Sequence, residues 1–162
     1  MIDLRVLTPD DWRAWRELRL AALADAPDAF GSRLADWQGE GDREERWRDR
    51  LSIHGAHDVI ASLDGTDAGM TTGVPTADDG TVELISMWVA PGARGRGVGD
   101  ALIGEVERWG RSTSAAVLRL TVMDQNAAAA ALYRRNGFEP TGEVEVDDDG
   151  RRELVLAKPL TG

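Results

Sequence analysis

The chain has 162 residues, of which 42% are hydrophobic and 30% charged, and this composition predicts one globular domain over residues 1–162. It contains no cysteine and two histidines, which excludes disulfides and thiolate chemistry and makes a metal site unexpected. A formal net charge of −10 disfavours nucleic acid and membrane surfaces as partners, and the lack of a long apolar run or a signal-peptide pattern predicts a cytoplasmic protein.

The N-terminal part of the chain predicts a strand followed by a helix. Residues 2–7 alternate apolar and polar side chains, which is typical of a short strand. Thr8 and Pro9 then form a helix start signal, and apolar residues recur at helical spacing over residues 12–23. The helix is expected to end before Pro27, where the chain must leave the α conformation.

A second helix and three strands are predicted next. Asp42 and Glu45 have the spacing of a capping box, which predicts that a charged helix begins there. Residues 59–63 and 68–74 have the pattern of two hairpin strands with an Asp-Gly turn between them. Residues 81–89 are almost continuously apolar, as expected for a central strand that is buried on both faces.

The remaining elements complete an α/β order. Helical spacing of apolar residues predicts a helix over residues 98–109, and residues 116–123 predict another buried strand. An alanine-rich helix is expected over residues 126–136, followed by strands over residues 138–146 and 152–156. The expected order is therefore β-α-α-β-β-β-α-β-α-β-β.

A glycine-rich turn follows the central strand and has the sequence Arg94-Gly95-Arg96-Gly97-Val98-Gly99. Backbone N–H groups at a helix start are unpaired and electropositive, and glycine lets a phosphate or pyrophosphate approach them. The turn lacks the Lys and Ser or Thr of a Walker loop, because Asp100 and Ala101 follow it, and its glycine spacing is not that of a dinucleotide-binding fingerprint. For the turn taken alone, a structural role without a ligand is the alternative.

Two motifs resemble those of the GCN5-related N-acetyltransferase (GNAT) superfamily. The acyl-CoA pyrophosphate loop of that family has the pattern Gln/Arg-x-x-Gly-x-Gly/Ala, which Arg94, Gly97 and Gly99 satisfy. The family's second motif, Asn-x-x-Ala-x-x-Leu-Tyr-x-x-x-Gly-Phe, is matched by Asn126, Ala129, Leu132, Tyr133, Gly137 and Phe138. The resemblance, which covers about residues 58–160, implies an α/β fold. Its mixed, mostly antiparallel sheet has six or seven strands and about four flanking helices, with a V-shaped split between the two central strands.

The resemblance implies direct transfer of an acetyl group from acetyl-CoA to a primary amine, without a metal. It assigns cosubstrate binding to Met87, Trp88, Val89, Arg94, Gly95, Arg96, Gly97, Val98, Gly99, Asn126 and Tyr133. For Asn126, a helix cap is a compatible second role. Tyr133 matches the family residue that protonates the departing thiolate, and the alternative is a tyrosine that only packs its ring on the sheet.

Glu83 is the candidate for the base that accepts the proton of the amine. It stands four residues before Met87 and matches the catalytic glutamate of the histone acetyltransferase branch of the family. A carboxylate on a buried strand can have a raised pKa and accept a proton directly or through water. The alternatives are that Glu83 anchors the amine electrostatically or has no role, and that His54 or His57 acts as the base.

The resemblance places the acceptor pocket between the first two helices and the late hairpin. It assigns acceptor binding to Phe30, Ser32, Trp37 and Glu83, with Gly31, Trp47, Glu143 and Glu145 as further candidates. For the tryptophans, plain core packing is the alternative. We expect a small-molecule amine as acceptor. A protein lysine or N-terminal acetyltransferase and a non-catalytic acyl-CoA sensor are the alternatives, and a homodimer is compatible with the family.

Overall fold

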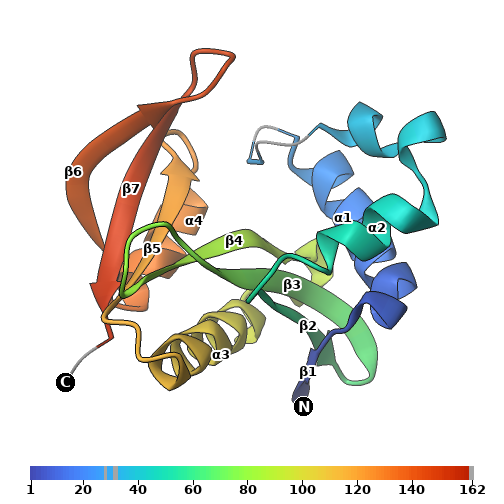
Figure 1. The fold of residues 1–162 in the computed structure, drawn as a ribbon, viewed down its shortest axis with the longest axis horizontal. Helices are drawn as coiled ribbons and strands as arrows, with labels where there is room; N and C mark the ends of the chain where they lie inside the picture. Colours follow the sequence, from blue (N-terminus) through green and yellow to red (C-terminus); the bar gives the residue numbers. More distant parts are fainter. Residues whose placement is uncertain (28, 31–32, 161–162) are drawn as a thin grey trace.

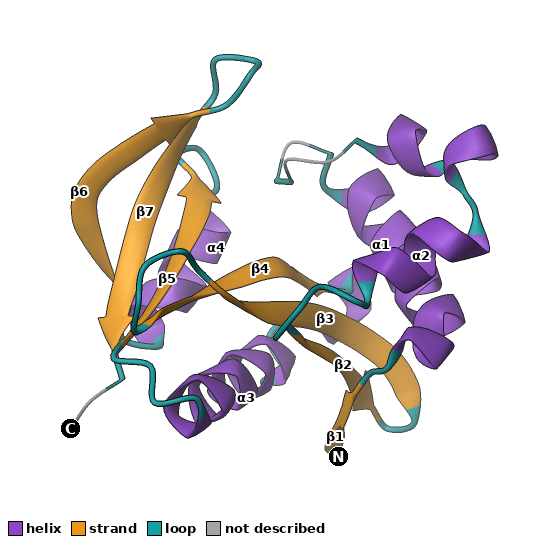
Figure 2. Ribbon diagram, viewed as in Figure 1, coloured by secondary structure: helices purple, strands orange, loops and turns teal. Residues whose placement is uncertain are grey.

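The computed structural model describes residues 1–27, 29–30 and 33–160, and over these residues the chain forms one seven-stranded sheet with helices on both faces (Figures 1 and 2). The strands are β1 (Ile2–Val6), β2 (His57–Leu63), β3 (Thr66–Pro75), β4 (Thr81–Val89), β5 (Val117–Met123), β6 (Glu139–Val146) and β7 (Arg152–Pro159). The α-helices are α1 (Trp12–Asp25), α2 (Glu44–Arg50), α3 (Val98–Ser112) and α4 (Ala127–Arg135). No helix in this described part of the chain is long and apolar enough to cross a membrane.

The two central strands separate along their length. The strand order is β1-β2-β3-β4-β5-β7-β6, and β4 with β5 is the parallel pair among antiparallel neighbours in the described sheet. Residues 81–83 of β4 pair with residues 117–119 of β5. Beyond these residues β4 continues to Val89 and β5 to Met123, but the two strands no longer pair with each other. The predicted split between the central strands is therefore confirmed, and the second half of β4 has one edge without a strand partner.

A β-bulge interrupts β4 just before this free edge. Thr72 pairs with Ile85 and Met70 pairs with Trp88, so β4 contains one residue more than β3 between the two pairs. Ser86 lies at the bulge with a φ of +55°, in the left-handed region that non-glycine residues rarely adopt. Such backbone strain is concentrated at functional sites.

Helices cover the two faces of the sheet unequally. On one face, α1 and α2 pack against the sheet through Trp15, Leu18, Ala22, Trp47, Ile60, Met70 and Trp88. On the other face, α3 and α4 enclose a core of Leu84, Ile103, Val106, Trp109, Leu118, Leu120, Tyr133 and Leu156. Figure 1 shows the β6–β7 hairpin and the α1–α2 region on opposite sides of β4.

The predicted capping box at Asp42 is wrong, because α2 begins at Glu44 and Asp42 has other partners. Arg16 donates to the Asp42 carboxylate through Nε at 2.7 Å and Nη2 at 2.5 Å, and Trp47 Nε1 donates to it at 2.8 Å. These hydrogen bonds, from Arg16 first and then from Trp47, lower the pKa of Asp42 to about 2. The carboxylate joins α1 to α2 instead of capping a helix.

Candidate active site

A cavity of about 700 Å³ lies at the free edge of β4. Its walls come from the end of α1, the second half of β4, the glycine-rich turn and α4. From β4 it is lined by Met87, Trp88 and Val89, whose N–H and C=O groups on the side of β5 have no strand partner. Unpaired strand groups at a cavity can bind an extended ligand as a further strand would be bound.

The glycine-rich turn presents unpaired backbone donors to this cavity. Gly95 and Gly97 have φ values of +76° and +89°, and a Cβ at Gly95 would meet no atom within 4 Å. The first backbone hydrogen bond into α3 runs from Ala101 N to the Gly97 carbonyl at 3.0 Å, so the N–H groups before Ala101 have no helical partner. A Cβ at Gly99 would approach Leu132 Cδ2 to 3.1 Å, so glycine there allows α3 and α4 to pack closely. The turn has the features of an anion-binding helix start.

Arg94 connects the turn to α1 and β4 through hydrogen bonds. Its Nη2 donates to Asp25 Oδ2 at 2.7 Å and its Nε donates to the Val89 carbonyl at 3.0 Å. Trp88 Nε1 donates to the same Asp25 oxygen at 3.0 Å. The hydrogen bonds from Trp88 and then Arg94 lower the pKa of Asp25. Asp25 therefore compensates the charge of Arg94. The donors of the turn that have no partner in α3 are its backbone N–H groups.

Most residues predicted to bind the cosubstrate meet at this cavity. It is lined by Met87, Trp88, Val89, Arg94, Gly95, Gly97, Gly99, Asn126 and Tyr133. Arg96 and Val98 are not among its lining residues. Arg96 is exposed, 3.6 Å from Asp64, and Val98 is buried in a core cluster with Leu102. Asp25 lines the cavity without having been predicted, because 69 residues separate it from Arg94 and no local pattern links them.

Asn126 and Tyr133 come from α4 and its cap. Asn126 Oδ1 accepts a hydrogen bond from Ala129 N at 3.2 Å, so the predicted capping role is confirmed, and the residue also lines the cavity. Tyr133 packs edge-to-face on Phe138, with 5.9 Å between the ring centroids. Burial raises the pKa of Tyr133 above its ordinary value near 10, so the phenol is protonated at neutral pH. Its side chain lines the cavity.

Glu83 lies outside the lining of the cavity, on the sheet face that α1 and α2 cover. It pairs with Val74 of β3 on one side and with Arg119 of β5 on the other, at the last point where β4 and β5 are joined. Burial raises the pKa of Glu83, and the nearby Arg119 opposes this effect. Glu145 and Glu153, from the β6–β7 hairpin, raise the pKa further. Glu83 thus belongs to an acidic cluster beside the split.

The predicted acceptor residues are divided between the cavity and the core. Phe30 lines the cavity. Trp37 instead packs against Trp47, with 4.6 Å between their ring centroids, and carries the Arg46 guanidinium at 4.0 Å. Trp47 is fully buried, so core packing describes it. Ser32, like Gly31, lies outside the described residues.

The two histidines do not approach the cavity. His57 Nε2 is 2.7 Å from Glu105 Oε2, and its ring stacks on Trp109 of α3 at 5.6 Å. These contacts place His57 on the sheet face that α3 covers, whereas Glu83 lies on the other face. His54 is exposed in the turn before β2.

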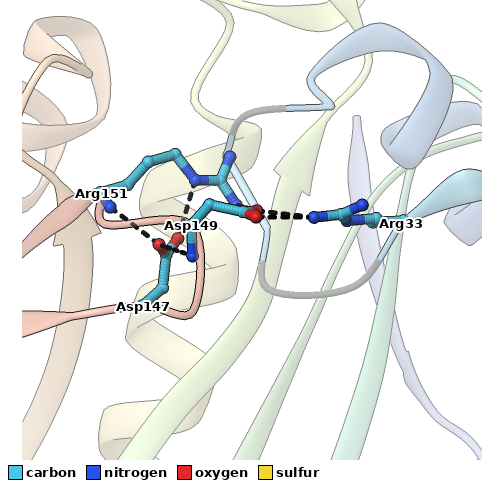
Figure 3. A network of polar contacts seen from close by, with 4 residues as sticks. All are labelled: Arg33, Asp147, Asp149 and Arg151. Atoms are coloured by element: carbon cyan, nitrogen blue, oxygen red, sulfur yellow. Dashed lines mark hydrogen bonds and ion pairs between the residues drawn. The ribbon is translucent and has the colours of Figure 1, made fainter.

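The tip of the β6–β7 hairpin forms a polar network (Figure 3). Asp147 Oδ1 accepts hydrogen bonds from the backbone N–H groups of Asp149, at 3.0 Å, and Arg151, at 2.8 Å. This arrangement shapes the turn and directs Asp149 toward Arg33. A second cavity of about 410 Å³ is lined by Pro27, Arg33, Leu34, Asp149 and Arg151.

The split sheet, the glycine turn at the start of α3 and the tyrosine on α4 are the features that the resemblance to the GNAT family predicts. The chain belongs to this family, because the profile of the acetyltransferase (GNAT) family matches residues 12–138. The predicted resemblance is thus confirmed.

Two curated relatives and two solved structures illustrate the similarity. The chain is 31% identical to the mycothiol acetyltransferase of Renibacterium salmoninarum over 142 residues, which are 85% of this chain and 40% of that protein. It is 28% identical to the aminoglycoside N(6')-acetyltransferase type 1 of Stenotrophomonas maltophilia, covering 87% of this chain and 88% of that protein. The chain spans about two-fifths of the length of the mycothiol acetyltransferases that it matches.

Among solved structures, the ribosomal-protein-alanine N-acetyltransferase of Brucella melitensis has a TM-score of 0.72 and 27% identity, covering 97% of this chain and 99% of that one. The PaiA N-acetyltransferase of Thermoplasma acidophilum, in complex with coenzyme A, has a TM-score of 0.75 and 21% identity, covering 98% and 99%. At that identity the second similarity concerns the fold.

Proposed function

We propose that the protein transfers an acetyl group from acetyl-CoA to a primary amine of a small molecule. The observation that carries this proposal is the composition of the large cavity. It combines the glycine turn, the unpaired edge of β4 at residues 87–89 and the side chain of Tyr133 in one space. These are the three kinds of group that binding and cleaving an acyl-CoA thioester requires.

The cosubstrate fits the residues that are present. The N–H groups at the start of α3 and the positive end of its dipole would bind the pyrophosphate. The free edge of β4 would bind the pantetheine through backbone hydrogen bonds, and one of its N–H groups would polarise the thioester carbonyl. Arg94 and Arg135 line the same cavity, but their charges are paired with Asp25 and Asp100, so the backbone donors would do most of the binding.

The reaction then needs two proton transfers. The neutral amine nitrogen attacks the thioester carbon, so that a C–N bond forms while the C–S bond breaks. The departing sulfur takes the proton of the Tyr133 hydroxyl, which burial keeps protonated. The proton lost by the nitrogen passes to Glu83, directly or through water, and the raised pKa of Glu83 makes it a stronger base than an ordinary carboxylate.

An amine acceptor is supported by the acidic cluster at the split. Glu145 and Glu153 stand directly opposite each other in the β6–β7 pairing, where like charges are unfavourable. Burial and then the charges of Glu145 and Asp147 raise the pKa of Glu153. Arg119 Nη2 donates to Glu145 Oε1 at 3.0 Å and offsets part of this repulsion, and a cationic ligand would relieve the rest. The small-molecule class is supported by the names of the mycothiol and aminoglycoside acetyltransferases among the relatives.

The test is release of free thiol from acetyl-CoA in the presence of polyamines, aminoglycosides, amino acids and short peptides. We expect turnover with at least one class of small amine. Turnover with peptides alone would favour a protein acetyltransferase. No turnover with any acceptor, together with tight CoA binding in calorimetry, would favour an acyl-CoA sensor.

A further inference from the structure

Arg19 is a buried cation that has no hydrogen-bond or ion-pair partner among the described residues. It lies on the inner face of α1 and is only 8% exposed. Among the described residues, none forms a hydrogen bond or ion pair with Arg19, and its Nη1 is fully buried. Its guanidinium stacks on the ring of Phe30 at 4.6 Å. Burying an uncompensated charge is unfavourable, and no described residue supplies an anion to Arg19.

The neighbouring Arg50 occupies the acceptors of this part of the core. It donates to Asp58 Oδ1 at 3.1 Å, to Thr72 Oγ1 at 3.0 Å and to Ser86 Oγ at 3.0 Å. Burial and then the charge of Arg50 lower the pKa of Arg19 to about 10, so Arg19 is still protonated at neutral pH. Of these two neighbouring cations, the described residues therefore compensate one, Arg50.

Arg19 lies next to the large cavity but is not one of the residues that line it. Phe30, on which Arg19 stacks, lines the large cavity. Arg50, whose charge reaches Arg19, binds Ser86 at the bulge of β4, one residue before Met87. The pairing of β3 with β4 places this cluster on the sheet face that also carries Glu83.

We propose that Arg19 binds a carboxylate of the acceptor, so that the acceptor is a small molecule with both an amine and a carboxylate, such as an amino acid. This inference rests on the proposed function and names its substrate class. A guanidinium binds a carboxylate through two parallel N–H donors, and neither ion needs a further partner to balance the charge. The acidic cluster of Glu83, Glu145 and Glu153 provides the opposite charge for the amine end.

The test uses acceptors with and without the carboxylate, and kcat/KM is expressed per neutral amine because amidation also lowers the pKa of the amino group. Wild type, Arg19→Met and Arg13→Met are assayed for thiol release from acetyl-CoA with amino acids and with the matching amino acid amides. Wild type is expected to prefer the acids by about tenfold or more in kcat/KM, as a charge-assisted hydrogen bond supplies, and Arg19→Met to bring the ratio near one. Arg13 is exposed and stacks on Trp12, so Arg13→Met is the matched control that keeps the preference.

Thermal unfolding gives a second readout that does not depend on turnover. Amino acids, but neither their amides nor inorganic phosphate, are expected to raise the Tm of wild type, with and without CoA. The effect is expected to be absent in Arg19→Met. Because Arg19 has no partner among the described residues, Arg19→Met by itself is not expected to lower the Tm, as the loss of a structural ion pair would.

Equal responses of wild type to acids and amides in both assays would overturn the carboxylate assignment, while acetylation of the amides would still support the proposed function. Protection by phosphate, or a weaker CoA affinity of Arg19→Met in calorimetry, would also overturn it, because Arg19 would then bind another anion or the cosubstrate. If CoA neither binds nor reacts, the proposed function fails, and the Tm shifts still decide the role of Arg19.

Discussion

Arg33 and Asp149 are 116 residues apart in the sequence, and Arg33 Nη2 lies 2.8 Å from each carboxylate oxygen of Asp149. The contact joins the segment before Leu34 to the tip of the β6–β7 hairpin, as Figure 3 shows. The two side chains are 68% and 46% exposed, so solvent screens the ion pair and it adds little to stability. Its effect is expected on the acceptor, because the two segments that it joins flank the acidic face of the split.

Loss of this ion pair is expected to weaken acceptor binding. Arg33→Ala should raise the KM for the amine by roughly two- to fivefold, the effect that an exposed ion pair supports, with the KM for acetyl-CoA unchanged. Asp149→Ala should give the same change, and the double variant should add nothing to it. Arg5→Ala, which breaks an exposed pair between Arg5 of β1 and Asp67 of β3, is the control. Unchanged amine KM in both single variants would contradict this role.

The glycine turn is expected to tolerate no side chain at Gly97. Its φ of +89° is strained for any L residue and most of all for a β-branched one. Gly97→Val should therefore weaken CoA binding by at least about tenfold, because the backbone must move away from the pyrophosphate. Gly92→Ala, at an open position of the preceding segment, should bind as wild type does. Calorimetry on folded protein decides, and wild-type affinity of Gly97→Val would rule the assignment out.

Removing the hydroxyl of Tyr133 tests the general acid. Tyr133→Phe should lower kcat by about a hundredfold or more while CoA affinity is retained, since the ring packing on Phe138 remains. Because burial raises the pKa of Tyr133, kcat of wild type should not fall from loss of this proton as the pH rises from 8 to about 10. Stopped-flow kinetics measures the rate of Tyr133→Phe, and a pH profile measures how the wild-type kcat depends on pH. Unchanged kcat in Tyr133→Phe would show that another group protonates the sulfur.

Glu83 is expected to produce the acidic limb of the pH profile. As the pH is lowered, kcat/KM should fall once Glu83 becomes protonated. Because burial raises the pKa of Glu83, this fall should begin at a higher pH than for a glutamate with the ordinary pKa near 4.3. In Glu83→Gln both the limb and most of the turnover should be lost. Glu17→Gln, on the exposed side of α1, serves as control. A higher amine KM without loss of the limb would assign Glu83 to amine binding alone.

The same residue makes stability depend on pH. Between the ordinary pKa and the raised pKa, native Glu83 keeps a proton that the unfolded chain has lost. The free energy of unfolding should therefore fall as the pH rises through this window, and the fall should be absent in Glu83→Gln. Urea unfolding at a series of pH values measures the difference between the two proteins.

Packing of α3 on the sheet depends on Gly73. A Cβ there would meet the Trp109 ring at 2.5 and 2.6 Å, so Gly73→Ala should destabilise the protein by about 1 to 3 kcal/mol. Gly104 lies within α3 with no atom within 4 Å of its Cβ position, and Gly104→Ala should stabilise by about 0.5 to 1 kcal/mol. Urea unfolding of both variants measures the effects. A Gly73→Ala variant as stable as wild type would contradict the close packing.

The sequence was most informative where the structure is determined locally. Gly95 and Gly97 adopt the left-handed backbone that their turn requires, and Asn126 caps the helix that its motif predicts. The almost continuous apolar run over residues 81–89 predicted the central strand β4. These features depend on neighbours within a few positions, so a pattern in the chain can reveal them.

Long-range contacts could not be predicted in the same way. The Asp42 carboxylate does not cap α2, because it accepts hydrogen bonds from Arg16, a residue on a different helix. The position of Asp25 at the cavity depends on how α1 packs over β4, and no spacing in the chain encodes it. Arg19 occupies an inward helical position, but only the placement of the surrounding side chains shows that none of the described residues pairs with it.

The most direct test of the account is to follow thiol release and amine acetylation in the same reaction. Acetyl-CoA and an amine acceptor are incubated with wild type, and with Gly97→Val as the variant impaired in cosubstrate binding. We expect one acetylated amine for each thiol released, and a slower rate with Gly97→Val. Thiol release without acetylated amine, or an equal rate with folded Gly97→Val, would contradict it.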